Sequence, residues 1–392
     1  MNTTDAKKLK IEQLLDSADV RLDGDRPWDV QVHNDKLFAR VLSQGSLGLG
    51  ESYMDGWWDC ERLDEFFYRV LRAQLDRKVR SWPGYFERII AKFVNLQTPS
   101  RAFHIGKHHY DIGNDLYQRM LGRRLIYSCA FWENASSLDE AQEAKLDLVC
   151  RKLGLEPGMR VLDIGCGWGG TARYAAERYG VEVVGVTVSE EQASFAKEMC
   201  RGLPIEIRYQ DYRSLNGTFD RILSLGMFEH VGPKNYATFM DVVRRRLKED
   251  GLFLLHTIGV QEATARCDPW IARYIFPNSK LPSAGEICGA VEGRFVVEHW
   301  QNLGAHYDRT LMHWFHSFQK NWRSLCDRYD EKFFRMWTYY LLSCAGVFRA
   351  RANQLWQVVL SPRGVPGGYR IARDRHEESS QRIEAEESIW SL

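Results

Sequence analysis

From about residue 157, short apolar runs alternate with segments of helical periodicity along the chain. Five such runs follow one another at residues 160–165, 181–188, 205–212, 219–227 and 251–258. Continuous apolar strands that alternate with helices are typical of a parallel sheet covered by helices on both faces. Two later runs, at residues 294–304 and 355–362, complete the prediction of an α/β fold with a doubly wound, seven-stranded sheet.

The first 95 residues follow a different pattern, mostly of helical period. Near the end of this region, five apolar residues fall on one face of a predicted helix: Phe86, Ile89, Ile90, Phe93 and Val94. The chain is therefore expected to divide into a smaller, mainly helical domain at residues 1–95, a linker at 96–104, a main α/β domain at 105–372 and a charged, mobile tail at 373–392.

The charges are balanced over the whole chain but not locally. Lys plus Arg number 53 and Asp plus Glu number 52, so no overall field favours a nucleic acid as partner. Between residues 69 and 107, however, basic residues far outnumber acidic ones. This excess is either the solvated face of a small helical core or a surface that meets anionic lipid.

The start of the chain and the cysteines limit the cellular setting. The first residues carry charges where a secretion signal needs an apolar segment, and no apolar run approaches the roughly 18 residues of a membrane span. The nine cysteines are scattered without a C-x-x-C pair, which favours neither disulfides nor a zinc site. We therefore expect a cytoplasmic protein that binds no metal. The 13 Trp, 17 Tyr and 19 Phe residues hint at an apolar substrate.

A glycine-rich turn, "VLDIGCGWGG", follows the first predicted strand directly. It places Gly165, Gly167 and Gly170 in G-x-G-x-x-G spacing, which lets the backbone turn sharply and approach a ligand. The motif alone fits a dinucleotide enzyme equally well, and a structural turn without any ligand is a third interpretation. Asp163, two residues before the first glycine, is better suited to a cationic amino-acid group than to a pyrophosphate.

The next two predicted strands favour S-adenosylmethionine over a dinucleotide. The second strand ends with Thr187, followed by Gln192, and lacks the acidic residue at its tip that a dinucleotide fold uses to bind ribose. After the third strand, Asp211 and Tyr212 could flank an adenine. This order resembles the class I methyltransferases, in which the third glycine would serve helix packing.

Several polar residues should gather at the carboxyl edge of this sheet, where doubly wound folds bind ligands. Glu229 and His256 follow the fourth and fifth strands, while Cys129 and Tyr307 lie in aromatic-rich segments elsewhere in the chain. His230, next to Glu229, is expected to point to the opposite face of the strand and to be structural. Each of these residues could also be an ordinary core or strand-end residue.

Seven long motifs in one order give a closer resemblance. They are "HHYDIGNDLY", "YSCAFW", "VLDIGCGWGG", "GMFEHVGPKNY", "LLHTIG", "DPWIARYIFPN" and "LWQVV". Together they resemble the cyclopropane fatty acid synthases, and the similarity covers nearly the whole chain, including the N-terminal region. The resemblance implies methyl transfer from S-adenosylmethionine to a cis double bond of a phospholipid acyl chain, a bound bicarbonate, a homodimer, and peripheral association with the inner face of the cytoplasmic membrane.

The resemblance also implies roles for individual positions. The expected catalytic residues are Cys129, Glu229, His256, Ile258 and Tyr307. The expected cofactor-binding residues are Tyr127, Ser128, Asp163, Gly165, Gly167, Trp168, Thr187, Gln192, Asp211 and Tyr212. Whether Cys129 acts through its side chain or its backbone stays open, and Trp168 could simply pack.

The chemistry explains why such a site needs these residue types. An unactivated alkene is a weak nucleophile, and its methylation leaves a carbocation that water would trap, so the pocket must be dry. Aromatic faces can stabilise that cation. Ring closure then needs a base for the new methyl group, and Glu229, His256 and Tyr307 would position a small anion in that role. A related methyltransferase that leaves a methyl branch or a hydroxyl, and a catalytically silent lipid-binding protein, are the alternatives.

Overall fold

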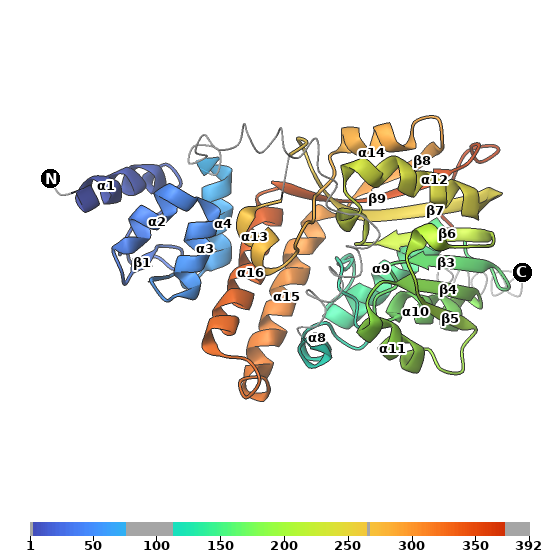
Figure 1. Ribbon diagram of the computed structural model, residues 1–392, viewed down its shortest axis with the longest axis horizontal. Coiled ribbons are helices and arrows are strands. Elements are labelled where there is room, and N and C mark those ends of the chain that lie inside the picture. The colour runs from blue at the N-terminus through green and yellow to red at the C-terminus, as the bar shows by residue number, and fades with distance from the viewer. Residues whose placement is uncertain (1–2, 76–112, 265–266, 373–392) are drawn as a thin grey trace, which may run out of the picture.

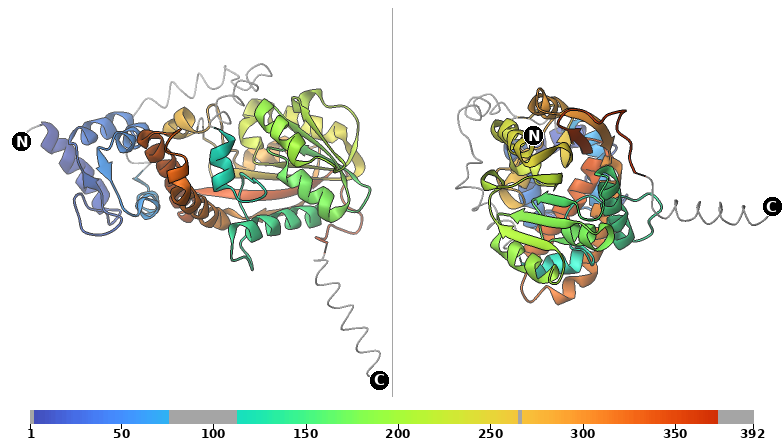
Figure 2. Two further views of the ribbon diagram at one scale, coloured as in Figure 1. Left: turned by 90° about the horizontal axis from the view of Figure 1, so that it is seen from below. Right: turned by 90° about the vertical axis from the view of Figure 1, so that its right-hand side faces the viewer.

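The computed structural model describes residues 3–75, 113–264 and 267–372. Along its longest axis, a group of N-terminal helices is followed by a long helical pair and then by a sheet with its covering helices (Figure 1). The view from below in Figure 2 shows the same order. In this part of the chain, no helix is both long enough and apolar enough to cross a bilayer.

The N-terminal region is helical, as predicted. Its elements are α1 (Thr3–Asp16), β1 (Gln31–Val32), α2 (Lys36–Gln44), α3 (Ser46–Met54), β2 (Trp58–Asp59) and α4 (Leu63–Arg72). The two short strands pair antiparallel and were not predicted. The predicted apolar face at Phe86–Val94, most of the basic cluster, the linker and the charged tail lie outside the described residues.

The N-terminal helices share one apolar core with the long helical pair, α15 (Gly304–Asn321) and α16 (Glu331–Arg349). Helix α4 packs directly on α16, because Gly346 allows a close crossing: a Cβ at this position would lie 2.6 Å from the backbone oxygen of Asp64. Leu63 and Phe66 of α4 belong to the same core cluster as residues of α16. The N-terminal region is therefore packed onto the rest of the molecule rather than tethered to it.

The sheet confirms the predicted doubly wound, seven-stranded class I methyltransferase fold. Its strands are β3 (Arg160–Ile164), β4 (Glu182–Thr187), β5 (Ile205–Tyr209), β6 (Phe219–Leu225), β7 (Leu247–Val260), β8 (Val296–Asn302) and β9 (Asn353–Ser361). Their order is β5-β4-β3-β6-β7-β9-β8, and β9 runs antiparallel to both of its neighbours. All seven predicted strands are present, but β6 ends two residues earlier than predicted and β7 is longer at both ends.

Helices cover both faces of the sheet because successive strand residues alternate between two cores. Leu162 packs toward α12 (Tyr236–Arg246) and α14 (Ala284–Val291), whereas its neighbour Val161 packs toward α9 and α10. The remaining helices are α8 (Asn114–Met120), α9 (Leu138–Lys152), α10 (Gly170–Tyr179), α11 (Glu190–Met199) and α13 (Pro269–Tyr274). Short 3-10 helices, η1 (Tyr212–Ser214), η2 (Phe228–His230), η3 (Pro233–Asn235) and η4 (Trp322–Ser324), complete the described elements.

Candidate active site

The glycine-rich turn connects β3 to α10 and needs glycine for two different reasons. Gly165 and Gly167 have positive φ angles of 89° and 55°, which side chains with a Cβ rarely adopt. Gly170, the first residue of α10, lies so close to the chain that a Cβ would be 2.0 Å from the backbone oxygen of Arg124. The first two glycines shape the turn, and the third permits helix packing, as predicted.

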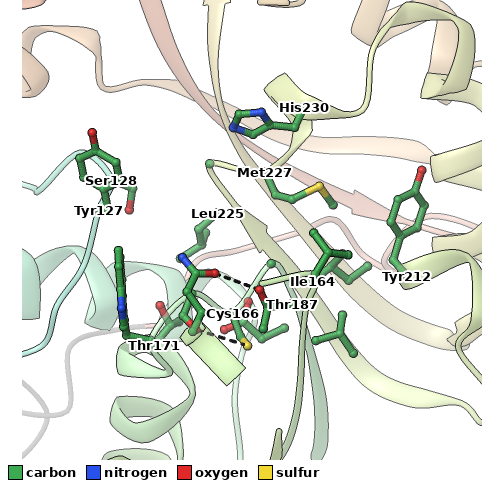
Figure 3. Close-up of a pocket in the computed structure, with 18 of the residues that line it drawn as sticks. Tyr127, Ser128, Ile164, Cys166, Thr171, Thr187, Tyr212, Leu225, Met227 and His230 are labelled. Atoms are coloured by element: carbon green, nitrogen blue, oxygen red, sulfur yellow. Dashed lines mark hydrogen bonds between the residues drawn. The ribbon is translucent and has the colours of Figure 1, made fainter. Parts of the chain in front are cut away.

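The turn forms the floor of a pocket at the carboxyl ends of β3, β4 and β6, which we call the strand-end pocket (Figure 3). All ten residues predicted to bind the cofactor line it: Tyr127, Ser128, Asp163, Gly165, Gly167, Trp168, Thr187, Gln192, Asp211 and Tyr212. Residues from separate segments of sequence thus meet in one cavity. Their placement fits the predicted ligand.

Two polar residues of the strand-end pocket already have partners inside it. The Thr187 hydroxyl donates to Oε1 of Gln192 at 2.9 Å. The Asp211 carboxylate accepts two hydrogen bonds from the guanidinium of Arg213, at 2.8 and 2.7 Å. Arg213 also lines the pocket and was not identified from the sequence, where its pairing with Asp211 two residues earlier is the only local signal.

Asp163 is the buried acid of this pocket. Its side chain is almost inaccessible, and Oδ2 has no hydrogen-bond partner among the described residues. Burial raises the pKa of Asp163 to about 7, an effect that the nearby Lys145 ammonium partly opposes. A buried carboxyl with an unused oxygen is suited to a cationic ligand, which would stabilise its charged form.

Lys145, on α9, is a buried residue of the site that sequence reasoning missed. It is fully buried, and its ammonium donates to the Ser128 hydroxyl at 3.0 Å. One turn earlier on α9, the Gln142 amide donates to the Ser128 carbonyl at 3.0 Å. Burial lowers the pKa of Lys145 to about 8, while the neighbouring Cys129 and Asp163 raise it. These two α9 residues hold the start of the "YSCAFW" segment against the pocket.

The other side of this segment is held by α15. The Ala130 amide and the Trp132 indole N–H both donate to the Thr310 hydroxyl, at 3.1 and 2.9 Å. Between the two anchors lies Cys129, which is completely buried and whose Sγ is 3.9 Å from the carbonyl oxygen of Leu303, next to α15. Burial raises the pKa of Cys129, so the residue is an uncharged thiol.

Glu229 and His256, the buried acid–base residues, lie beside the strand-end pocket. Glu229 is on η2 rather than on a strand, and its Oε1 accepts a hydrogen bond from the Ile258 amide at 2.7 Å. Its Oε2 is buried without a partner in the described part of the chain. Burial raises the pKa of Glu229 to about 7, although the Ile258 amide lowers it somewhat. Ile258 thus contacts Glu229 through its backbone amide and not through its side chain.

His256 lies on β7 and is completely buried. Its Nδ1 is 3.2 Å from the Gln357 amide nitrogen, whereas Nε2 contacts no hydrogen-bonding group that the structure describes. Burial, together with the lysines 145 and 152, places the pKa of His256 well below its ordinary value. The imidazole is therefore neutral at physiological pH.

Tyr307 lies on α15, one turn after Leu303, and contacts aromatic rings on two helices. Its ring centroid is 4.6 Å from that of Phe348 and 5.9 Å from that of Trp314. The Trp314 ring in turn lies 5.2 Å from Tyr127 of the strand-end pocket. The aromatic segments thus form a continuous apolar wall from α15 to the pocket.

His230 corrects one prediction. Because residues 228–230 form a 3-10 helix, neighbouring side chains do not alternate between two faces as in a strand. His230 consequently lines the strand-end pocket, where Figure 3 shows it on the same side as Met227. It is neutral, because burial lowers its pKa to about 4. The expectation that this residue points away from the site is wrong.

The family model described as mycolic acid cyclopropane synthetase matches residues 97–358. Cyclopropane-fatty-acyl-phospholipid synthase of Escherichia coli K12 is 55% identical over 365 residues, which are 92% of this chain and 94% of the relative.

Solved structures show the same likeness. The cyclopropane synthase MmaA2 from Mycobacterium tuberculosis superposes with a TM-score of 0.63 at 33% identity and covers 68% of this chain and 99% of its own. The mycolic acid cyclopropane synthase CmaA1, solved with SAH and CTAB, gives 0.62 at 34% identity over 66% of this chain and 97% of its own.

Proposed function

The chain belongs to the mycolic acid cyclopropane synthetase family, and we propose that it is the phospholipid-modifying kind: it methylates the cis double bond of an unsaturated phospholipid acyl chain and closes a cyclopropane ring. The observation that carries the proposal is that the strand-end pocket adjoins the buried Glu229 and His256. His230, which follows Glu229, lines the pocket, and so does Gly226, whose amide donates to the His256 carbonyl at 2.9 Å. The 55% identity to the E. coli synthase over 92% of the chain supports the choice of a phospholipid substrate.

S-adenosylmethionine fits the strand-end pocket as the methyl donor. The unpartnered Oδ2 of Asp163 would meet its ammonium group, and the open turn at Gly165 and Gly167 would admit its amino-acid portion. Asp211 and Tyr212, at the far side of the pocket, would contact its nucleoside. When bound, this cofactor supplies an electrophilic methyl group on a sulfonium.

The residues around the pocket would favour carbon methylation by excluding water. Methyl transfer to the alkene would form a C–C bond from its π electrons as the donor's C–S bond breaks, which would leave a positive charge on the acyl chain. The half-buried ring of Tyr127 and the buried ring of Trp314 would supply aromatic faces that stabilise this charge and apolar surface that keeps water out.

Ring closure requires removal of a proton from the added methyl group, and we propose a bound bicarbonate as the acceptor. Its site would be formed by the two buried polar atoms that lack partners among the described residues, Oε2 of Glu229 and Nε2 of His256, together with Tyr307. The raised pKa of Glu229, about 7, suits this arrangement, since a neutral carboxyl can donate to an anion that a carboxylate would repel.

The cellular setting is also part of the proposal. The enzyme acts in the cytoplasm as a homodimer and docks peripherally on the inner face of the cytoplasmic membrane through its N-terminal region. The apolar residues at 86–94 and the basic excess at 69–107 support docking on an anionic lipid surface.

One assay separates this function from the alternatives. The purified protein is mixed with S-adenosylmethionine and vesicles of either unsaturated or fully saturated phospholipid, and release of S-adenosylhomocysteine is measured. Release only with unsaturated lipid, and a cyclopropane product by mass spectrometry and NMR, is expected. A methyl branch or a hydroxyl in the product would identify a related methyltransferase, and no release with either lipid would indicate a silent lipid-binding protein.

A further inference from the structure

A row of polar side chains crosses three neighbouring strands behind the active site. His256 of β7 is aligned with Gln357 of β9, and Gln357 is aligned with Gln301 of β8. His256 and Gln357 are both fully buried. Polar groups in such a position are retained only where each finds a hydrogen-bonding partner.

The row is completed by a buried lysine from the helix that covers this face. Lys152, the last residue of α9, is completely buried and donates hydrogen bonds to Oε1 of Gln357, at 2.7 Å, and to Oε1 of Gln301. The Gln357 amide nitrogen lies 3.2 Å from Nδ1 of His256. The three groups Lys152, Gln357 and His256 thus form one chain of hydrogen bonds.

The chemistry of these groups sets the direction of every bond in the chain. A lysine ammonium has only donors, so the Gln357 oxygen must face it and the Gln357 nitrogen must face the imidazole. An amide nitrogen can only donate, so Nδ1 of His256 must accept and carries no proton. Burial lowers the pKa of Lys152 to about 7. The ammonium requires this direction, and the uncharged amine also has two N–H groups, one for each amide oxygen, so the same arrangement is available to it.

We infer that Lys152 and Gln357 are positioning residues that fix His256 as the tautomer with its proton on Nε2. The consequence for catalysis rests on the proposed function. Nε2 is the buried atom that has no partner in the described structure, so the fixed tautomer turns it into a donor for an oxyanion. The other tautomer would present a lone pair to the same anion and repel it.

The test changes one hydrogen-bonding atom in the chain Lys152–Gln357–His256 while keeping the size of the side chain. In Gln357→Glu, an oxygen replaces the amide nitrogen opposite Nδ1, and Lys152 keeps an acceptor. The ring should therefore shift its proton to Nδ1. Nitrogen-15 NMR of the full-length, histidine-labelled protein, without cofactor or bicarbonate, reports which ring nitrogen carries the proton, and His256→Gln identifies the signal.

The expected results are a proton on Nε2 in the unsubstituted protein and on Nδ1 in Gln357→Glu. Loss of an orienting partner of a functional histidine costs on the order of 10–100-fold, so kcat should fall in that range while the Kd for S-adenosylmethionine changes less than about twofold. Lys152→Met is a second variant, in which the amide is free to turn and the preference for Nε2–H should weaken.

Gln301→Glu is the matched control. It introduces the same carboxylate next to Lys152, one strand further from His256, and should leave the tautomer as it is. A proton on Nδ1 in the unsubstituted protein, or a proton that stays on Nε2 in both Gln357→Glu and Lys152→Met, would overturn the inference. Undiminished kcat in a Gln357→Glu protein whose proton has moved would overturn the positioning role. The tautomer result does not depend on bicarbonate, whose role is judged by a separate titration.

Discussion

The strand-end pocket and the buried acid–base residues lie side by side but are built differently. The pocket is formed by loops that follow parallel strands, and two of its polar groups are held by neighbours within five residues in sequence: Gln192 by Thr187, and Asp211 by Arg213. Glu229 and His256 instead rely on partners far along the chain, including Gln357, which is 101 residues from His256.

The difference indicates how the two halves of the site, the strand-end pocket and the acid–base residues, would each bind a ligand. The pocket provides shape, with one unsatisfied acid at Asp163 for a cationic group. The acid–base residues provide unsatisfied polar atoms in a dry interior, where leaving a donor or acceptor without a partner costs about 1–3 kcal/mol. Such a cost is tolerated where a ligand completes the bonds. Substitutions in the first half should therefore affect cofactor binding, and those in the second should affect turnover.

The largest effect is expected from the floor of the strand-end pocket. Asp163→Ala removes the charged partner of the ligand, and loss of one partner of a buried charge pair costs about 2–5 kcal/mol, so S-adenosylmethionine affinity should fall at least about 30-fold. Gly167→Val forces a β-branched residue into a backbone with φ of 55° and should abolish binding. Isothermal titration calorimetry measures both effects.

Gly202→Val is the control for the glycine substitution. Gly202 has a φ of 81° and, like Gly167, has free space within 4 Å of the position that a Cβ would occupy, but it does not line the pocket. The variant should lose stability and keep the affinity of the unsubstituted protein. Unchanged affinity in both Asp163→Ala and Gly167→Val would contradict the assignment of the pocket.

The next effect is a loss of turnover when the acid–base residues or Tyr307 are substituted. Glu229→Gln, His256→Ala and Tyr307→Phe should each lower kcat, by about 10²–10⁴-fold where proton removal is impaired, while cofactor affinity stays within about twofold. Depleting the buffer of carbonate should slow the unsubstituted enzyme, and added bicarbonate should partly rescue a weakened variant. If neither the enzyme nor its variants respond to bicarbonate, the proposed base is wrong.

The same contrast explains what the sequence could predict. The five parallel strands could be identified because buried parallel strands are continuous apolar runs. Pocket residues such as Gly165, Gln192 and Asp211 could be placed because they follow strand ends by a few positions. His230 was misplaced because the strand before it ends at Leu225 and a 3-10 helix follows. The short apolar run gave no sign of that change in geometry.

Two supporting lysines of the site were missed for a physical reason. A lysine on a helix normally lies on the solvated face, so Lys145 and Lys152 attract no attention in the sequence. Both nevertheless fall on the same helical stripe as the buried Ala141 and Leu148, at spacings of three, four and seven residues. A lysine within the apolar stripe of a helix is the signal that could have found them.

Substitutions in the N-terminal region, outside both halves of the site, should affect membrane binding and not cofactor binding. Arg88 and Lys92 lie outside the described residues, within the predicted basic and apolar segment. Each basic residue near an anionic surface contributes about 1 kcal/mol, so Arg88→Glu with Lys92→Glu should weaken binding to anionic vesicles by at least about 30-fold. Vesicle sedimentation measures this, and salt should weaken the binding of the unsubstituted protein.

The matched control for vesicle binding reverses two exposed basic residues on the helices of the sheet, Lys197 and Arg245. Lys197→Glu with Arg245→Glu changes the net charge equally and should leave vesicle binding nearly unchanged. Cofactor affinity should stay the same in both double variants. If the affinity for vesicles does not depend on lipid charge, on salt or on residues 88 and 92, the protein docks through another surface.

A pH dependence, tested without any large change in the site, separates the two acids. Burial raises the pKa of both Asp163 and Glu229 to about 7 in the ligand-free protein. A cationic ligand stabilises only the charged form of Asp163, so binding below this pKa must release one proton. The affinity for S-adenosylmethionine should therefore rise about tenfold per pH unit between about pH 5 and 7, and level off above. Calorimetry in buffers of different ionisation enthalpy measures the released proton directly. Glu229→Gln should keep this dependence and Asp163→Asn should lose it, whereas the reverse result would exchange the roles of the two acids.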